Sequence, residues 1–177
     1  MRLETSGVQE IDVPIAVVWS NLNDPMFVAS AAAGVESVEP IDETQYRVIA
    51  FLGVGSISLR FTLHVQLHDV VPLAGLRMSV QGAAPGSAMR VEAGAALSPM
   101  GAGAPRAPSG AGATRLAWTV ASDVHGKIVS IGARMLQGTM RRRIEMFWTQ
   151  FSANCVAAYA LARAAREGTG SAERSPA

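Results

Sequence analysis

Two histidines in one alternating segment are the first candidates for metal or acid–base chemistry. His64 and His68 lie within residues 56–69, where apolar and polar residues alternate. A strand would place both on the same face, but at about 3.3 Å per residue they would stand about 13 Å apart. Zinc ligand nitrogens must each lie about 2.1 Å from the metal. The spacing therefore predicts two solvated histidines and no metal site.

His125 and Cys155 are the remaining candidates for catalysis. His125 follows Asp123 by two residues at the end of a predicted strand. The pair could serve as acid and base, but its spacing also fits a carboxylate that caps the next helix, which we favour. Cys155 falls on the apolar stripe of a predicted helix, as an unreactive buried thiol does. The sequence has no glycine-rich phosphate loop, nucleophile elbow or paired-cysteine motif. We expect no catalytic residue and no enzyme.

Three consecutive arginines, Arg141, Arg142 and Arg143, form the strongest charged feature. Consecutive helical residues point in directions 100° apart, so we expect Arg142 to face water and its neighbours to flank the apolar stripe. Together with Arg134 they could dock on anionic lipid headgroups or an acidic partner. The alternative is a solvated helix surface with a salt bridge to Glu145.

The charge is divided along the chain. Residues 1–125 hold 7 Arg against 11 Asp or Glu, and residues 126–177 hold 8 Lys or Arg against 3 Glu. The net charge of +1 argues against a nucleic-acid partner. The single cysteine excludes an internal disulfide and suits a reducing compartment. With no secretory signal and no run of about 18 apolar residues, we expect a cytoplasmic protein that touches the inner membrane face at most peripherally.

Hydrophobic periodicity predicts an α+β domain with a curved antiparallel sheet, because most of the connections between strands are short. Hydrophobic residues make up 49% and charged residues 16% of the 177 residues, which suits one globular domain. Two short helices are predicted from Pro14 and, capped by Asp24, from Pro25 to about Ala31. Period-two segments predict seven strands, at residues 2–13, 35–41, 45–52, 56–69, 74–82, 88–97 and 114–124.

A long amphipathic helix is predicted from Lys127 to about Ala165. Apolar residues recur there at three- and four-residue steps, and Gly132 and Gly138 weaken the helix by roughly 1 kcal/mol each. We expect a single domain over residues 1–166, with a flexible hairpin loop at 98–113 and a disordered tail at 167–177. The loop consists almost entirely of Gly, Ala, Pro and Ser, so an inert insertion is favoured over a lid.

The long helix must cover the apolar face of the sheet, but it is narrower than the sheet. A helix is about 10 Å wide, whereas seven strands at about 4.8 Å span about 30 Å. Either the space is filled as a core or a cavity remains. Apolar residues with the parity to line it are Phe27, Leu52, Phe61, Met78, Met89, Trp118, Met140, Phe147 and Phe151. Tyr46, Thr119 and Arg143 are the candidates for polar groups inside.

The element order and several motifs resemble the helix-grip fold of the START-like, polyketide cyclase and Bet v 1-like (SRPBCC) superfamily. Within it, the chain resembles the CoxG-like family, named after the G subunit of carbon monoxide dehydrogenase. The resemblance rests on "VPIAVVWSNLNDPMFVASAAAGVESVE", "GVGSISLRFTLHVQLHDVVP", "GAAPGSAM" and "GATRLAWTVASDVHGKIVSIGARMLQGTMRRRIEMFW". It covers residues 1 to about 160, and it is most specific at "TRLAWTV" and the glycines that follow.

The resemblance implies an accessory protein, encoded with molybdenum hydroxylases of the CO dehydrogenase type. Such proteins help to bring the enzyme to the membrane and hold a hydrophobic ligand such as a quinone or lipid. We therefore expect no cofactor beyond such a ligand, an apolar small molecule as partner, and a molybdenum hydroxylase complex as a further partner. Two alternatives stay open: a cyclase or aromatase acting on an apolar substrate in the cavity, and an interaction module with a filled core.

Overall fold

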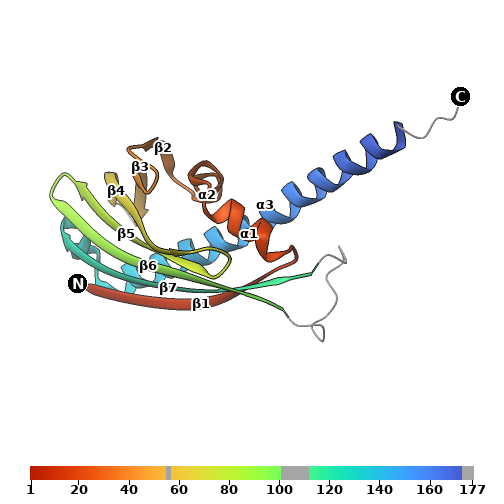
Figure 1. The fold of residues 1–177 in the computed structure, drawn as a ribbon. Coiled ribbons are helices and arrows are strands. Elements are labelled where there is room, and N and C mark those ends of the chain that lie inside the picture. The colour runs from red at the N-terminus through yellow and green to blue at the C-terminus, as the bar shows by residue number, and fades with distance from the viewer. Residues whose placement is uncertain (55–56, 101–111, 173–177) are drawn as a thin grey trace, which may run out of the picture.

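A computed structural model of the chain describes residues 1–54, 57–100 and 112–172. Its sheet has seven antiparallel strands in the order β1-β7-β6-β5-β4-β3-β2. The sheet curls around one side of a long helix, α3 (Figure 1). The strands are β1 (Arg2–Ile11), β2 (Val35–Pro40), β3 (Gln45–Val54), β4 (Ile57–Val71), β5 (Gly75–Ala84), β6 (Ser87–Pro99) and β7 (Thr114–Gly126). The predicted helix-grip architecture is confirmed.

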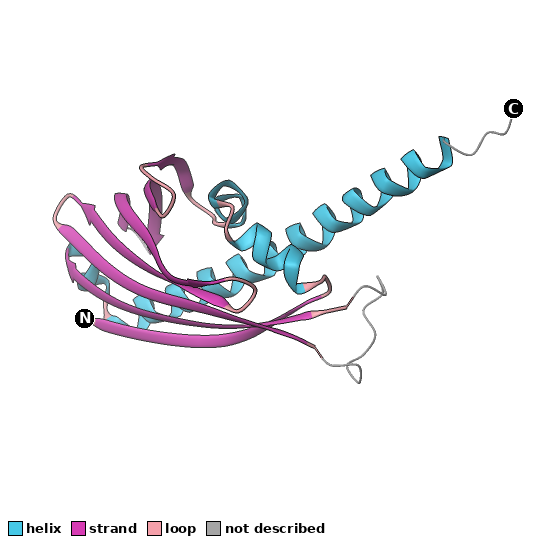
Figure 2. Cartoon of the chain, viewed as in Figure 1, coloured by secondary structure: helices cyan, strands magenta, loops and turns pink. Residues whose placement is uncertain are grey.

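Two short helices, α1 (Ile15–Leu22) and α2 (Pro25–Ala31), connect β1 to β2. Asp24 caps α2, because its Oδ1 accepts hydrogen bonds from the backbone N–H groups of Met26 (2.9 Å) and Phe27 (3.1 Å). Pro25 occupies the first helical position, where no backbone donor is needed. The Asp-Pro signal therefore fixes where the chain turns beside the sheet (Figure 2).

The long C-terminal helix begins later than predicted. Residues Lys127–Ile131 form a 3₁₀ helix, η1, and α3 begins at Ala133 and runs to Ala172. The interruption lies at Gly132, whose φ of 96° is in the left-handed region that favours glycine. Gly126, with φ 86°, precedes η1 as its N-cap, and the side chain that accepts from the first turn is that of Ser87, whose Oγ accepts from the Ile128 N–H at 3.2 Å. The expected cap by Asp123 is therefore wrong.

The ends of two predicted irregular segments have regular secondary structure. Ser98 and Pro99 belong to β6, and the Met100 N–H donates to the Ala113 carbonyl at 2.9 Å, so the hairpin extends into the predicted 98–113 loop. Residues 101–111 lie outside the described part. The predicted 167–177 tail is helical to Ala172, because the chain meets no helix-breaking proline there; residues 173–177 again lie outside the described part.

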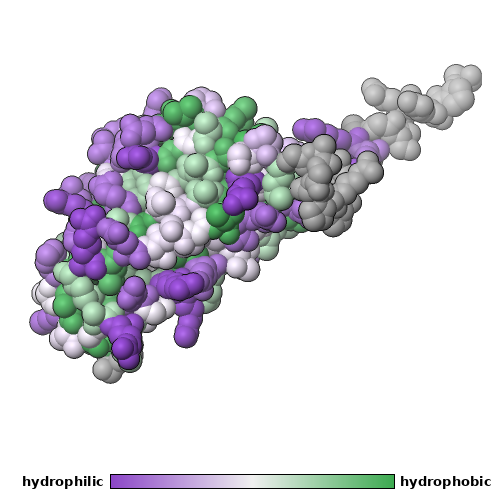
Figure 3. All heavy atoms as spheres, turned by 90° about the horizontal axis from the view of Figure 1, so that it is seen from below, coloured by the Kyte–Doolittle hydropathy of each residue, from purple (hydrophilic) through white to green (hydrophobic). Residues whose placement is uncertain are grey.

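Two separate hydrophobic clusters join α3 to the sheet. The first, called cluster A, contains ten buried residues: Ile11, Val13, Val18, Ala31, Leu97, Leu116, Trp118, Trp148, Phe151 and Cys155. The second, called cluster B, contains Leu3, Phe61, Val124, Ile128 and Leu136. Beyond cluster A, α3 projects past the sheet (Figure 1), and Leu161 there is 73% exposed. The outward face that Figure 3 shows is mixed, with hydrophilic and apolar side chains side by side.

Candidate ligand-binding cavity

A cavity of about 950 Å³ lies between the concave face of the sheet, α2 and the middle of α3. Its floor is made by inward residues of the central strands, among them Val65, Leu76, Met78, Val80 and Trp118. Trp118, Val80 and Leu76 are less than 9% exposed. The volume is at the upper end of the range, about 300–1,000 Å³, that holds small ligands in proteins. The arrangement has room for an apolar molecule, which favours an open cavity over a filled core.

The cavity remains open because several of the side chains that project into it from the sheet are short. Val80, Val91, Ala93 and Ala95 project from β5 and β6, where larger side chains would fill the space beneath α3. Clusters A and B hold α3 at either side of this region, so the helix cannot settle onto the sheet. Strand alternation puts these positions on the inner face. These positions were not predicted as lining residues, because short side chains do not stand out in a hydrophobic pattern as large ones do.

The predicted lining residues divide between the cavity and the two clusters. Met78, Trp118 and Phe147 line the cavity. Phe27 and Phe151 pack in cluster A, and Leu52, Phe61, Met89 and Met140 pack in or against cluster B. All nine face inward, but the latter six are packed within or against the two clusters.

The aromatic rings form the wall between cluster A and the cavity. The Trp118 and Trp148 rings are stacked at 6.3 Å between centroids, and Phe147 meets Trp148 edge to face at 4.8 Å. Phe151 contacts Phe27, Phe147 and Trp148 from the buried side, with centroids 5.6 to 6.0 Å apart. Edge-to-face and offset stacking are the favourable aromatic geometries. A rigid aromatic surface thus faces the empty volume.

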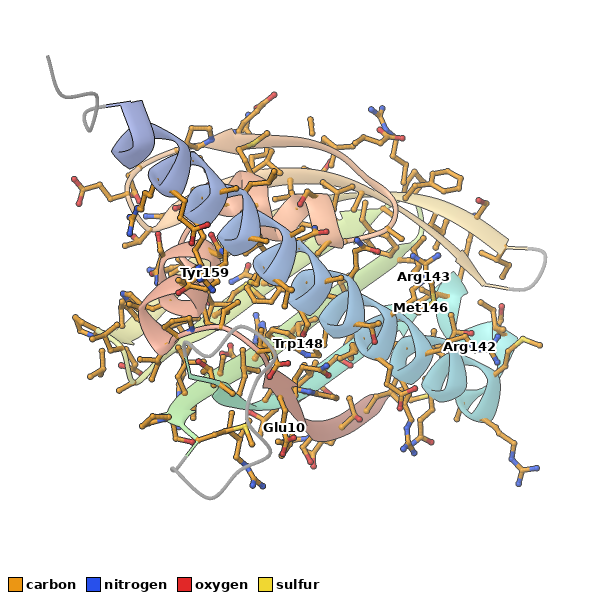
Figure 4. The ribbon with its side chains drawn as sticks, turned by 90° about the vertical axis from the view of Figure 1, so that its right-hand side faces the viewer. Glu10, Arg142, Arg143, Met146, Trp148 and Tyr159 are labelled. Atoms are coloured by element: carbon orange, nitrogen blue, oxygen red, sulfur yellow. The ribbon has the colours of Figure 1, made fainter. Side chains whose placement is uncertain are left out.

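Arg142 and Arg143 of α3 are the charged residues of the lining. Arg143 Nη1 donates to the Ala33 carbonyl at 3.3 Å, which joins α3 to the segment between α2 and β2. Arg143 and Met146 lie on the side of α3 toward β3, while Trp148 lies on the side toward β1 (Figure 4). Met146 is 57% exposed, so this side of the cavity reaches the surface. The lining is therefore apolar inside with a cationic rim.

The polar groups proposed for the interior differ in their positions. Tyr46 is 9% exposed and lines the cavity, with its hydroxyl donating to the Glu43 carbonyl at 3.1 Å. Arg143 lines it from the rim. The Thr119 side chain points outward, since its Oγ1 would lie 3.2 Å from a Cβ at Gly94 and the inward neighbour is Trp118. Thr119 therefore contributes backbone to the wall, and its hydroxyl is not an interior group.

Comparison with known families decides the identity at the family level. The model of the carbon monoxide dehydrogenase G-subunit family (CoxG) matches residues 7–156. The chain belongs to the CoxG family. No curated protein matches the sequence.

Several solved structures share the fold of this CoxG-family chain. A conserved protein from Geobacillus kaustophilus has a TM-score of 0.77 at 24% identity, with 88% of this chain and 96% of that chain covered. A START superfamily protein from Mycobacterium smegmatis has a TM-score of 0.64 at 9% identity, covering 87% and 97%. The Zhui aromatase/cyclase from Streptomyces sp. R1128 has a TM-score of 0.59 at 15% identity, covering 88% and 94%. These similarities show the fold.

The candidate residues for catalysis in this CoxG-family chain lie away from the cavity. His125 is exposed at the end of β7, and neither it nor Asp123 lines the cavity. His68 Nδ1 lies 3.2 Å from Asp69 Oδ2, and its Nε2 lies 3.6 Å from Glu92 Oε2, on the outer face. Among the described residues, no group of three or more His, Cys, Asp or Glu could hold a metal ion. The histidines therefore bring no acid–base pair to the interior.

Cys155 is fully buried in cluster A. Burial raises the pKa of its thiol above the ordinary value of 9.0, and the Asn21 Nδ2 hydrogen bond to Sγ, at 3.3 Å, opposes this shift. A buried thiol with a raised pKa is a poor nucleophile. The expected role of Cys155 as a small apolar residue agrees with this position.

The four arginines considered for docking differ in their surroundings. Arg134 is exposed near the start of α3, and Arg141 pairs with Glu145 at 2.9 Å, as an exposed i,i+4 ion pair. Arg142 is exposed, as expected, but it also lines the cavity with Arg143. In the described part of the chain, no helix combines the length and the apolar character needed to span a membrane.

Proposed function

We propose that this CoxG-family protein is a non-catalytic carrier that holds a hydrophobic molecule, a quinone or a lipid, in the cavity beneath α3. The single observation that carries the proposal is the apolar volume of about 950 Å³ that is walled by the sheet, α2 and α3. Burial of apolar ligand area there would contribute about 25 cal/mol per Å². The absence of paired titratable side chains from the described lining favours binding over catalysis.

The family name supports a second part of the proposal. We infer that the protein associates with a molybdenum hydroxylase of the CO dehydrogenase type in the cytoplasm, and helps to recruit it to the inner face of the membrane. Exposed basic residues near the start of α3, Arg134 and Arg141, would meet the acidic partner or anionic headgroups. No nucleic acid takes part in this role.

Native mass spectrometry and organic extraction of the purified protein test the carrier function. We expect quinone or lipid to co-purify, and added ligand to raise the melting temperature through its preference for the folded state. If a range of quinones and lipids neither co-purifies nor shifts the melting temperature, the carrier function is wrong. Co-sedimentation with anionic vesicles, compared between the wild type and Arg134→Gln, tests the membrane contact separately.

An enzyme of the cyclase or aromatase type is the second candidate. The observation in its favour is the shared fold with the Zhui aromatase/cyclase. Such chemistry needs groups that accept and donate protons inside the cavity, and Tyr46 is the one lining residue with a hydroxyl that is deeply buried. Turnover of an aromatic polyketide substrate that is lost in Tyr46→Phe would establish this candidate and displace the carrier.

A further inference from the structure

The charged groups of the cavity are all of one sign. Arg142 and Arg143 line it, and the described lining includes no aspartate or glutamate. Neither guanidinium has a carboxylate partner among the described residues. The adjacent Arg141, which points elsewhere, is by contrast paired with Glu145. Arg142 is exposed and Arg143 partly exposed, so both guanidinium groups stand at the rim without a counter-charge, where an anion can reach them.

Several other polar side chains of the lining already have acceptors within the protein. Asn23 donates to the Trp19 carbonyl at 2.8 Å, Tyr46 to the Glu43 carbonyl at 3.1 Å, and Gln150 to Asn154 at 2.8 Å. Arg142 makes no hydrogen bond to a described residue, and Arg143 uses one donor on Ala33. A guanidinium has five N–H donors, so most of the free donor capacity of the cavity lies on these two arginines.

The free hydrogen-bond donors lie on one side of the cavity, so the cavity has a charged side and an apolar side. Arg142 and Arg143 belong to α3 at the side where exposed Met146 marks the opening, whereas Leu76, Val80 and Trp118 form the apolar floor on the sheet. A ligand with one charged end and one apolar chain matches this division. A wholly apolar ligand would leave the guanidinium groups to water at the rim and gain nothing from their charge.

We propose that the occupant is an amphiphile with an anionic head, a carboxylate or a phosphate, held by Arg142 and Arg143 while its apolar chain lies against the sheet. This inference rests on the proposed carrier function and narrows it to acidic amphiphiles. The Arg142 guanidinium is the principal contact because it is otherwise unengaged, and Arg143 adds charge from its fixed place against Ala33. Arginine suits this role because its planar fork binds both oxygens of such a head.

Displacement of the neutral fluorophore N-phenyl-1-naphthylamine from the full chain tests the head preference. Oleate and oleoyl lysophosphatidate represent the two anionic heads, oleyl alcohol keeps the chain without the charge, and decylubiquinone offers neutral oxygen acceptors. We expect both acids to displace the probe at concentrations on the order of tenfold lower than the alcohol, since hydrogen bonds to charged groups are the strong ones. Raised salt should reduce this preference by screening.

Variants of the arginines test which residues cause the preference for an anionic head. Arg142→Gln should weaken both acids on the order of tenfold and leave the alcohol unchanged, with an unaltered melting temperature because the residue is exposed and unpaired. Arg143→Lys, which keeps the charge, should lose less than Arg143→Gln. Arg163→Gln is the matched control, because Arg163 is an exposed arginine of the same helix outside the cavity.

Three outcomes would overturn the inference. Equal binding of oleate and oleyl alcohol, unchanged by Arg142→Gln, would remove the anionic head and leave the carrier function standing. If Arg142→Gln weakened decylubiquinone as much as it weakens oleate, the arginines would bind any oxygen acceptor and would not select for negative charge. Failure of every compound to displace the probe or stabilise the protein would overturn the carrier function as well.

Discussion

Truncation of two aromatic residues one helical turn apart distinguishes the cavity wall from the core behind it. Phe151 is 0% exposed, and its ring contacts those of Phe27, Phe147 and Trp148. Phe151→Ala opens a new void in cluster A, and such changes cost about 3–5 kcal/mol. Phe147 is half-buried and already borders the cavity. Its truncation enlarges existing space, so we expect a smaller cost of about 1–2 kcal/mol.

Phe151→Ala should therefore have the larger effect on thermal stability, and Phe147→Ala should have the larger effect on probe binding. A domain of this size loses roughly 2–4 °C per kcal/mol, so Phe151→Ala should lower the melting temperature by about 6–20 °C and Phe147→Ala by about 2–8 °C. Phe147→Ala should weaken N-phenyl-1-naphthylamine binding more than Phe151→Ala does, because only Phe147 would contact the ligand. Equal losses of stability, or a larger binding defect in Phe151→Ala, would refute the division between wall and core.

Three further predictions concern single positions. Gly7→Ala places a Cβ about 2.5 Å from the Trp118 ring and should cost about 1–3 kcal/mol in denaturant unfolding, whereas Gly53→Ala, with no heavy atom within 4 Å, should not; equal effects would contradict the packing. Asp24→Ala should lower the free energy of unfolding by about 1 kcal/mol through loss of the α2 cap, and an unchanged value would show that the cap is dispensable. Because the folded-state pKa of Cys155 is raised, the native state holds this proton more tightly, so the free energy of unfolding should fall as pH rises above 9.0; Cys155→Ala should lose less over that range, and parallel curves would contradict the shift.

Most of the fold could be predicted from strand alternation and from the turn residues. All seven predicted strands are present within a few residues of their predicted bounds, because one face of each is buried and a slip would expose it. The Asp24-Pro25 signal placed α2 correctly, since both residues act locally. The start of α3 was misplaced because the sequence shows that Gly132 weakens a helix but not that its φ is positive. That angle depends on how η1 packs against β7.

The cavity was harder to locate than the sheet that forms it. Parity shows that Phe61 and Trp118 both face inward, but not what lies opposite each of them. Phe61 meets Ile128 and Leu136 and is closed off, while Trp118 borders open space. The signal that could have found the cavity is the run of short inward residues on β5 and β6, such as Val80 and Ala93. Whether Arg142 reaches the rim of the cavity depends on where α3 is held, which periodicity alone does not fix.

The attachment of α3 at two separate places has a mechanical consequence. Leu136 is fixed in cluster B, and Phe151 and Cys155 are fixed in cluster A, while the turns between them border the cavity. Helices bend gently at low cost, so these intermediate turns can bow outward for a thicker guest while both attachments stay closed. The amide protons of that span should then exchange with solvent more slowly when the guest is present, and those of the two attachment points should keep their rates.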